Sequence, residues 1–205
     1  FTARHVLVKP ENPRELWILL HGFSQSGDFF FHKLKSILPA DVAVLAPHGP
    51  FPNVEGKPPY KVGYAWYFYE MKRDEYYIDM KVAESYIAAL VEKLDLGHLP
   101  KRVIGYSQGG YFAPFAALKL SNVLQVVGLS CQFLEPELPA LMPFRLDGLH
   151  GSADEVVAGA MAQVLHKRLV DKGNKGAFEF VDGTGHGLSK EMLMSLERVV
   201  TPGIL

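Results

Sequence analysis

The sequence predicts an α/β protein with a mostly parallel central sheet and helices on both faces. Short apolar runs of strand length alternate along the chain with longer segments whose apolar residues recur about every 3.6 positions. Several of the runs are apolar at nearly every position, as expected of parallel strands covered on both faces. This alternation is typical of a sheet built from strand–helix–strand units.

Six apolar runs are the predicted strands of this sheet, at residues 16–20, 42–46, 103–106, 126–130, 144–149 and 177–181. Residues 5–9 are a weaker candidate, for an edge strand. The predicted helices cover residues 28–38, 74–95, 108–120, 155–172 and 190–200. Four of them are followed by stop signals, at Pro39, Gly97, Gly173 and Pro202. Pro114 predicts a kink or an irregular first turn in the helix at 108–120.

Residues 47–70 interrupt the alternation with prolines, glycines and many aromatic side chains. A long loop inside a compact domain is usually functional or disordered, and the aromatic content argues against disorder. We expect an ordered loop that either covers one edge of the sheet or walls an apolar acyl pocket with residues 60–69. The three phenylalanines at 29–31 either join that pocket or pack the first helix.

Length and composition exclude several classes of protein. The 205 residues fit one domain over residues 1–205, with little room for a large lid domain. A net charge of −1 argues against phosphate-driven binding of nucleic acid. The apolar runs are far shorter than the roughly 20 residues of a membrane-spanning helix, and a single cysteine, Cys131, allows no disulfide framework. The first five residues show no signal-peptide pattern, although a start without Met is compatible with a processed chain, and we expect a cytoplasmic protein.

Residues 105–109 (Gly-Tyr-Ser-Gln-Gly) predict a nucleophilic serine, Ser107. They follow an apolar strand and precede an apolar helix, which is the context that the G-x-S-x-G pattern requires. The sharp turn leaves no room for side chains at 105 and 109, and the helix N-terminus directs N–H groups at developing negative charge. Cys131, at the end of a buried strand and with no histidine beside it, is a poor alternative nucleophile.

A base and an acid are expected after the serine, in the order Ser, acid, His. His186 lies in a glycine-rich loop after the strand at 177–181, and His150, at the end of a strand, is the alternative base. His166 falls in a helical pattern among Lys and Arg, where a solvated face is the default. Asp154 is the preferred acid; it competes with a role as the N-cap of the helix at 155–172, and Glu155 is the fallback.

The segment at 21–27 predicts half of an oxyanion hole. Acyl transfer needs two N–H donors, one from the residue after the nucleophile, Gln108, and one from the loop after an earlier strand. The His-Gly turn after the strand at 16–20 offers the N–H of Phe23, with Ser24 next. The alternative is a simple strand-to-helix turn capped by Ser26 or Asp28.

These motifs together resemble the phospholipase/carboxylesterase group of small α/β-hydrolases, which includes acyl-protein thioesterases and bacterial carboxylesterases. The resemblance runs from about residue 16 to residue 196. It rests on His-Gly-Phe at 21–23, Gly-Tyr-Ser-Gln-Gly-Gly at 105–110, His-Gly-x-x-Asp-x-x-Val at 150–157, Gly-x-Gly-His at 183–186 and the aromatic Ala-Trp-Tyr at 65–67. The chain departs from the family at Ser24, where glycine is usual, and at residue 152, where Ser replaces an acidic residue after Gly151.

The resemblance implies an α/β-hydrolase fold, a triad of Ser107, Asp154 and His186, oxyanion N–H groups from Phe23 and Gln108, and no cofactor. We expect a serine hydrolase that cleaves small or medium acyl esters through an acyl-enzyme, with the aromatic residues Trp66 and Tyr67 binding the small-molecule substrate. The alternatives are a thioesterase, lysophospholipase or peptidase on the same triad, and a non-catalytic binding protein on the same scaffold. No His and carboxylate cluster has the spacing of metal ligands, so a metallohydrolase is not expected.

Overall fold

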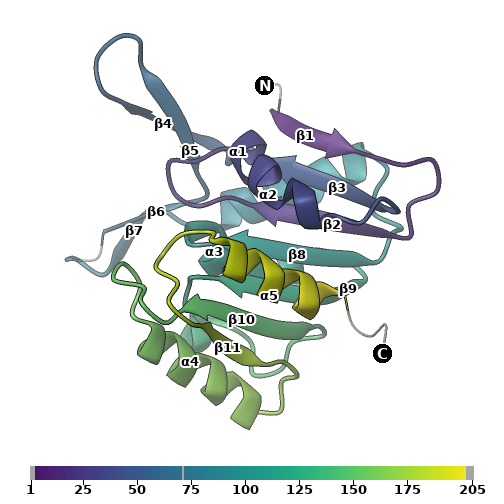
Figure 1. The fold of residues 1–205 in the computed structure, drawn as a ribbon. Coiled ribbons are helices and arrows are strands. Elements are labelled where there is room, and N and C mark those ends of the chain that lie inside the picture. Colours follow the sequence, from purple (N-terminus) through teal and green to yellow (C-terminus); the bar gives the residue numbers. More distant parts are fainter. Residues whose placement is uncertain (1–2, 71, 202–205) are drawn as a thin grey trace.

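The computed structural model describes residues 3–70 and 72–201, and within them the chain forms a seven-stranded sheet with helices on both faces (Figure 1). The strands lie in the order β1-β3-β2-β8-β9-β10-β11. All neighbours are parallel except β1 and β3, so β1 is an antiparallel edge strand. Their bounds are β1 (His5–Val8), β2 (Glu15–Leu20), β3 (Val42–Pro47), β8 (Lys101–Tyr106), β9 (Val123–Leu129), β10 (Arg145–Gly151) and β11 (Phe178–Val181). The predicted α/β fold class is confirmed, and the stop signal at Pro202 and the first two residues lie outside the described residues.

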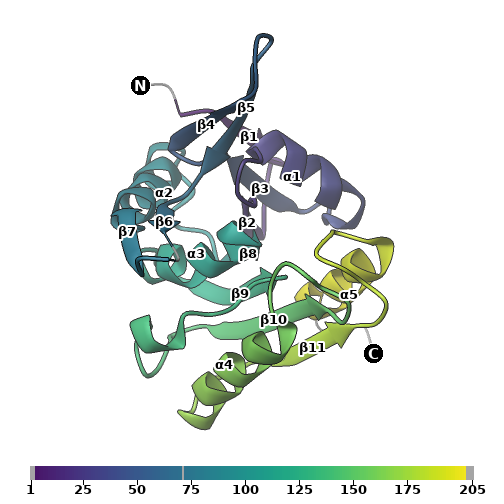
Figure 2. The same ribbon diagram turned by 90° about the vertical axis from the view of Figure 1, so that its left-hand side faces the viewer.

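Within residues 3–70 and 72–201, five α-helices cover the two faces of the sheet, α1 (Gly27–Leu34), α2 (Lys81–Lys93), α3 (Gln108–Leu118), α4 (Gly159–Asp171) and α5 (Lys190–Val200). Alternate residues of the central strands point to opposite faces, so the molecule has two cores. One core joins the sheet to α2, α3 and α4, and the other joins it to α1 and α5. Figure 2 shows α1 and α5 together on one side of the sheet. None of the helices in the described residues is long and apolar enough to cross a lipid bilayer.

Two predicted helices begin later than their sequence patterns indicate. The segment expected as a helix from residue 74 first forms β7 (Glu75–Ile78) and becomes helical only at Lys81. Its N-terminal part pairs instead with β6 (Phe68–Glu70), a contact that the helical spacing of apolar residues does not reveal. The helix expected from residue 155 begins at Gly159, because the N–H groups of Val156 and Val157 donate to Asp154 Oδ1.

The segment at 47–70 is not the loop without regular structure that the sequence predicts. It contains the hairpin of β4 (Phe51–Glu55) and β5 (Lys61–Ala65), and then β6. The hairpin of β4 and β5 stands out from the body of the molecule in both views (Figures 1 and 2). The base of β5 is bonded to the turn after β2, where Ser24 N–H donates to Tyr64 O and Tyr64 N–H donates to Gln25 O.

The expectation of a solvated His166 is wrong. The side chain is buried, and its Nε2 lies 2.8 Å from Leu146 O. Burial is the main cause that lowers the pKa of His166 below its ordinary value. The ring is therefore a core residue that joins α4 to the sheet.

Candidate active site

The sequence motifs converge at one end of the sheet. Ser107 follows β8, the segment with Asp154 follows β10, His186 follows β11 and Phe23 follows β2. Because these four strands are parallel, their carboxyl ends lie at the same edge, where α/β proteins bind their ligands. Phe23 and His186, 163 positions apart in the sequence, thus meet at this edge because their strands run in the same direction.

Ser107 occupies a strained turn between β8 and α3. Its φ is +49° and its ψ is −120°, a conformation that residues with side chains rarely adopt. A Cβ at position 105 would lie 2.2 Å from Gly109 O, and one at 109 would lie 2.1 Å from Leu20 O. The two glycines are therefore a steric requirement of the turn that exposes the Ser107 hydroxyl.

Ser107, His186 and Asp154 form a continuous hydrogen-bonded chain. His186 Nε2 lies 3.0 Å from Ser107 Oγ, and His186 Nδ1 lies 2.8 Å from Asp154 Oδ2. An ionised carboxylate only accepts, so the proton of the neutral imidazole is on Nδ1 and Nε2 is free to accept from the serine. This is the geometry of a nucleophile, a general base and the group that orients the base.

The Asp154 carboxylate is held as an anion by several donors. Its side chain is fully buried, and burial alone would raise its pKa. The N–H groups of Val157 and Val156 and the imidazole of His186 outweigh this effect and keep the pKa of Asp154 below its ordinary value. Asp154 lies before the first turn of α4, so the N-cap role considered from the sequence is not the one it has.

His150, the alternative base, does not face Ser107 but the rear of Asp154. Its Nε2 lies 3.2 Å from Asp154 Oδ2 and 3.0 Å from Val157 O. Both partners are acceptors, so Nε2 carries the proton; Nδ1 is buried and bonds to no described residue. Sequence reasoning missed this contact of His150 with Asp154, although the His-Gly-x-x-Asp spacing was its signal.

Two backbone N–H groups beside Ser107 are without an acceptor among the described residues, those of Phe23 and Gln108. Both residues line the same cavity as Ser107. The N–H of Ser24, the other candidate, is already bonded to Tyr64 O at 3.0 Å. The structure thus leaves open the two donors that the sequence predicts for an oxyanion hole.

Side-chain contacts hold the turn that carries Phe23. The Nε2 of the buried His21 accepts from Gly49 N–H at 2.9 Å, and its Nδ1 lies 2.8 Å from Gly22 O. Burial lowers the pKa of His21 to about 4, so the ring is neutral and donates from Nδ1. Ser24 has a φ of +57°, which explains why glycine is usual at this place, and its hydroxyl lies 2.6 Å from Glu55 Oε1 on β4.

Trp66 is placed differently from the sequence prediction. Its side chain is fully buried, stacks on Phe112 and donates from Nε1 to His21 O at 2.8 Å. It does not line the cavity at Ser107; it is bonded instead to the turn that carries Phe23. Tyr67 does line that cavity.

The side chain of Gln108 joins the aromatic segment to the turn at Ser107. Its Oε1 accepts from Trp66 N–H at 3.1 Å, and its Nε2 donates to Tyr67 O at 2.9 Å. The residue that offers a backbone N–H beside Ser107 therefore also holds residues 66–67 in place.

The cavity at Ser107 has a volume of about 800 Å³ and is largely aromatic and apolar. Its lining residues are Phe23, Tyr67, Phe68, Tyr69, Tyr76, Ser107, Gln108, Tyr111, Gln132, Leu134, Glu137, Val156 and Val157. The aromatic segment thus walls the cavity, as expected, but through residues 67–69 only. The phenylalanines at 29–31 do not line it, and Phe30 is instead buried in the core with α1.

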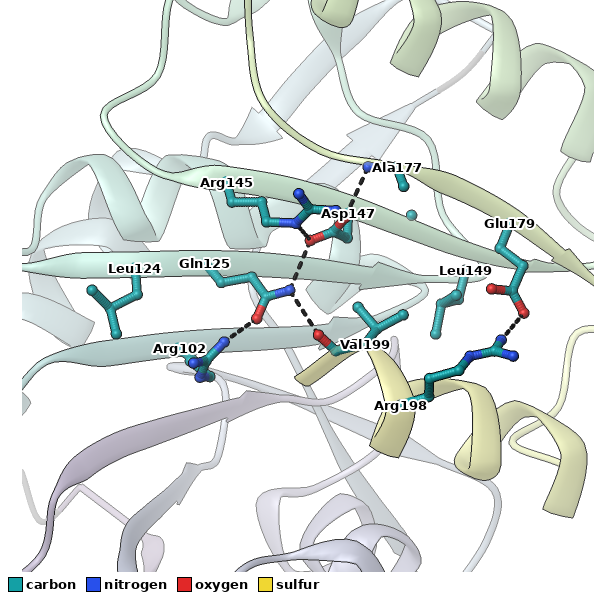
Figure 3. Close-up of a pocket in the computed structure, with 11 residues that line it drawn as sticks. Arg102, Leu124, Gln125, Arg145, Asp147, Leu149, Ala177, Glu179, Arg198 and Val199 are labelled. Carbon is teal, nitrogen blue, oxygen red and sulfur yellow. Dashed lines mark hydrogen bonds and ion pairs between the residues drawn. The ribbon is translucent and has the colours of Figure 1, made fainter. Parts of the chain in front are cut away.

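A second cavity of about 500 Å³ lies at the amino ends of the strands, remote from Ser107. Figure 3 shows that its polar side chains are bonded to one another. Arg102 and Asp147 are both bonded to Gln125, Arg145 is bonded to Asp147, and Arg198 is bonded to Glu179. A network with its charges satisfied stabilises the sheet and offers no free group to a ligand.

Among the described residues, no group of three or more His, Cys, Asp or Glu side chains is arranged to hold a metal ion.

Comparisons with known proteins agree with this architecture. The chain is similar in structure to esterase PE8 (21% identity, TM-score 0.77), with 98% of each chain covered. It is also similar to acyl-protein thioesterase 2 of Zea mays (19% identity, TM-score 0.78), with 97% of this chain and 98% of the other covered. A carboxylesterase from Mesorhizobium loti gives 18% identity and a TM-score of 0.75, over 98% of this chain and 95% of the other.

Sequence comparison assigns the chain to a family. No curated protein is a significant match to it. The family model described as Phospholipase/Carboxylesterase matches residues 2–201, nearly the whole chain. The chain therefore belongs to the phospholipase/carboxylesterase family of α/β-hydrolases and is a hydrolase of the esterase or thioesterase type.

Proposed function

We propose that the protein is a serine carboxylesterase with Ser107 as nucleophile, His186 as general base and acid, and Asp154 as the group that orients the imidazole. The observation that carries the proposal is the hydrogen-bonded chain from Asp154 through His186 to Ser107 beside an aromatic cavity. A serine hydroxyl becomes an effective nucleophile only when a base accepts its proton, and this arrangement supplies the base.

The reaction proceeds in two halves. Ser107 Oγ attacks the ester carbonyl while His186 Nε2 takes its proton, and the N–H groups of Phe23 and Gln108 stabilise the oxyanion of the tetrahedral intermediate. The intermediate expels the alcohol, which receives the proton from His186, and leaves an acyl group on Ser107. Water then attacks the acyl-enzyme with the same proton transfers in reverse order and releases the acid.

The substrate class follows from the lining of the cavity. Aromatic and aliphatic side chains surround Ser107, so we propose small or medium acyl esters as substrates. Thioesters are the alternative, because the same acyl-enzyme forms from them and because the chain resembles a thioesterase in structure. A cytoplasmic location completes the proposal and stays a prediction from the sequence.

Labelling with a fluorophosphonate tests the nucleophile. The wild-type protein should be labelled, and Ser107→Ala should lose both the label and at least about 10⁴-fold in ester hydrolysis. Ser130→Ala is the matched control, because Ser130 also follows a strand, β9, with a positive φ of 48°. Labelling that persists in Ser107→Ala would refute the assignment.

Rates on p-nitrophenyl esters of increasing acyl length, compared with a thioester and an amide, test the substrate class. We expect the short and medium esters to be hydrolysed fastest and the amide slowest. A thioester preferred over every ester of the same acyl group would assign the protein as a thioesterase. Wild-type protein that binds these compounds without turning them over would show a binding protein on the hydrolase scaffold.

A further inference from the structure

The cavity at Ser107 carries one charge among the residues that line it, the carboxylate of Glu137. Glu137 lies at the end of a short 3-10 helix (Glu135–Glu137) that follows β9 in the chain. No Lys or Arg lines the cavity within the described residues, so a bound group meets negative charge and no positive charge. A channel for a plain alkyl chain needs no such carboxylate.

Tyrosine rings form the wall next to Glu137. The Tyr76 ring lies 5.9 Å from that of Tyr67 and 4.9 Å from that of Tyr69, measured between centroids, and all three line the cavity. Burial, with the charge of Glu137 as the next cause, raises the pKa of Tyr76 to about 12. Burial likewise raises the pKa of Tyr67, to which the charge of Glu137 contributes. These phenols are therefore neutral at physiological pH. Aromatic rings, whose faces carry partial negative charge, thus line the cavity together with a carboxylate.

The charge of Glu137 is not neutralised by a neighbouring cation of the described chain. The neighbouring Glu135 is paired with Lys172, and Glu84, on the far side of Tyr76, is paired with Lys119. Glu137 forms no ion pair with any residue in 3–70 or 72–201. The Tyr76 phenol donates a hydrogen bond to its carboxylate, and Lys81, which lines the adjoining cavity with Glu137, is paired with Asp79. The negative charge of Glu137 thus has no cationic partner and acts on whatever occupies the cavity.

We propose that the cavity selects esters that carry a cationic group of the trimethylammonium type, which binds among Tyr67, Tyr69 and Tyr76 with Glu137 as its counter-ion. Aromatic faces attract such cations, and the attraction grows when the cation is partly removed from water. The carboxylate adds a Coulomb attraction that a neutral chain of equal size does not feel. The inference rests on the proposed function, because it names the substrates of the same Ser107 site.

Matched ester pairs test this selectivity and distinguish the two positions that the cation can have in an ester. On the acyl side, the p-nitrophenyl ester of 4-(trimethylammonio)butanoic acid is compared with its neutral isostere, the ester of 5,5-dimethylhexanoic acid. On the alcohol side, butyrylcholine is compared with 3,3-dimethylbutyl butyrate. We expect the cationic member of at least one pair to have the higher kcat/KM, by about tenfold.

Glu137→Gln tests the counter-ion. This variant keeps the size of the side chain and removes the charge, so the ratio of cationic to neutral kcat/KM should fall by about threefold to fivefold, mainly through KM, and the remaining preference should come from the tyrosine rings. Glu155→Gln is the control, because Glu155 is exposed beside Val156 but does not line the cavity, and its ratio should stay within about twofold of wild type. Raising the ionic strength should reduce the wild-type ratio in the same direction as Glu137→Gln.

The possible results separate the two proposals. If the wild-type protein hydrolyses the neutral esters without preferring the cationic members, the selectivity is refuted and the esterase stands. A preference that is unchanged in Glu137→Gln also refutes the role of this carboxylate. Failure to hydrolyse any of the four esters, with no labelling of Ser107, overturns the proposed function itself.

Discussion

His150 Nε2 lies 3.2 Å from Asp154 Oδ2, the same carboxylate oxygen that lies 2.8 Å from His186 Nδ1. Asp154 is therefore held between two imidazoles, His186, which faces Ser107, and His150, which faces the core. The rear imidazole stacks on Phe178 and also bonds to Val157 O, so it fixes the turn that carries the acid. We interpret His150 as a positioning residue that acts through Asp154.

Replacing His150 should therefore change catalysis as well as stability. His150→Leu removes a polar imidazole that contacts Asp154 and bonds to Val157 O, so we expect kcat to fall by about tenfold with little change in KM, and the acid limb of the pH profile to move to higher pH. His150→Gln places an N–H at a similar reach and should restore most of the activity. His166→Leu is the control, because His166 is also buried near Phe178 but lies away from Asp154, and it should lower the free energy of unfolding without moving the pH profile. Equal pH profiles for His150→Leu and wild type would contradict the interpretation.

Trp66 gives a second prediction, about a side chain that supports the site from behind. Trp66→Phe keeps an aromatic ring against Phe112 but leaves His21 O without its donor, which costs about 1–3 kcal/mol when the group is buried. We expect kcat to fall by about tenfold for all acyl lengths alike, since the loosened turn carries the N–H of Phe23.

Trp17→Phe is the matched control for that measurement. Trp17 is equally buried and donates from Nε1 to Glu15 Oε2, but it lies in β2 on the other face of the sheet. This variant should lose stability and keep kcat. A rise in KM restricted to bulky acyl groups in Trp66→Phe would instead indicate direct contact with substrate.

A third prediction concerns the glycine after Gln108. Gly109→Ala would place a Cβ 2.1 Å from Leu20 O, so β2 and α3 must move apart. We expect a loss of about 3 kcal/mol or more in the free energy of unfolding, measured by urea denaturation. Gly187→Ala is the control in the same site, because no atom lies within 4 Å of its added Cβ, and it should stay within about 0.5 kcal/mol of wild type. Comparable unfolding midpoints for the two variants would show that the close approach at Gly109 is not required.

The fourth prediction is a pH dependence of stability from His21. The folded state lowers the pKa of this imidazole from 6.5 to about 4, so the unfolded chain binds a proton that the folded chain does not. The contribution of neutral His21 to the free energy of unfolding is complete above pH 6.5, falls as the pH drops, and is lost by pH 4. The total loss in the free energy of unfolding is about 3 kcal/mol.

Unfolding titrations of wild type and His21→Asn between these two pH values measure this contribution. The buried His166, whose pKa is also lowered, adds a slope of the same sign to both proteins, so the difference between the curves isolates His21. The curves should converge toward pH 4. Two parallel curves would rule out the assigned protonation state.

Residues with strong local signals could be predicted from the sequence. The helix at Lys190–Val200 was predicted with the observed bounds, and the serine turn and the glycine-rich segment of His186 follow buried strands as expected. Such strands and turns depend on apolar runs and glycines, which can be recognised in the local sequence without knowing which segments pack against them.

The remainder depends on contacts between distant segments. Tyr76 lies in a strand because it pairs with Tyr69, and the helical spacing of the residues after 74 hides this pairing. Trp66 and Tyr67 are adjacent in the chain, yet one is fully buried and the other lines the cavity, and aromatic composition alone does not distinguish them. No motif in the sequence marks Glu137 as a site residue, because only the fold brings it to the cavity that Ser107 also lines.

The double contact of Gln108 has a consequence for protein engineering. Its backbone N–H lies next to Ser107 in the chain, and its side chain is bonded to both Trp66 and Tyr67. A loop exchange that imports the aromatic segment of a relative, in order to alter acyl preference, must therefore bring a compatible residue at 108 with it. The two segments are one transplantable unit, although 40 positions of sequence separate them.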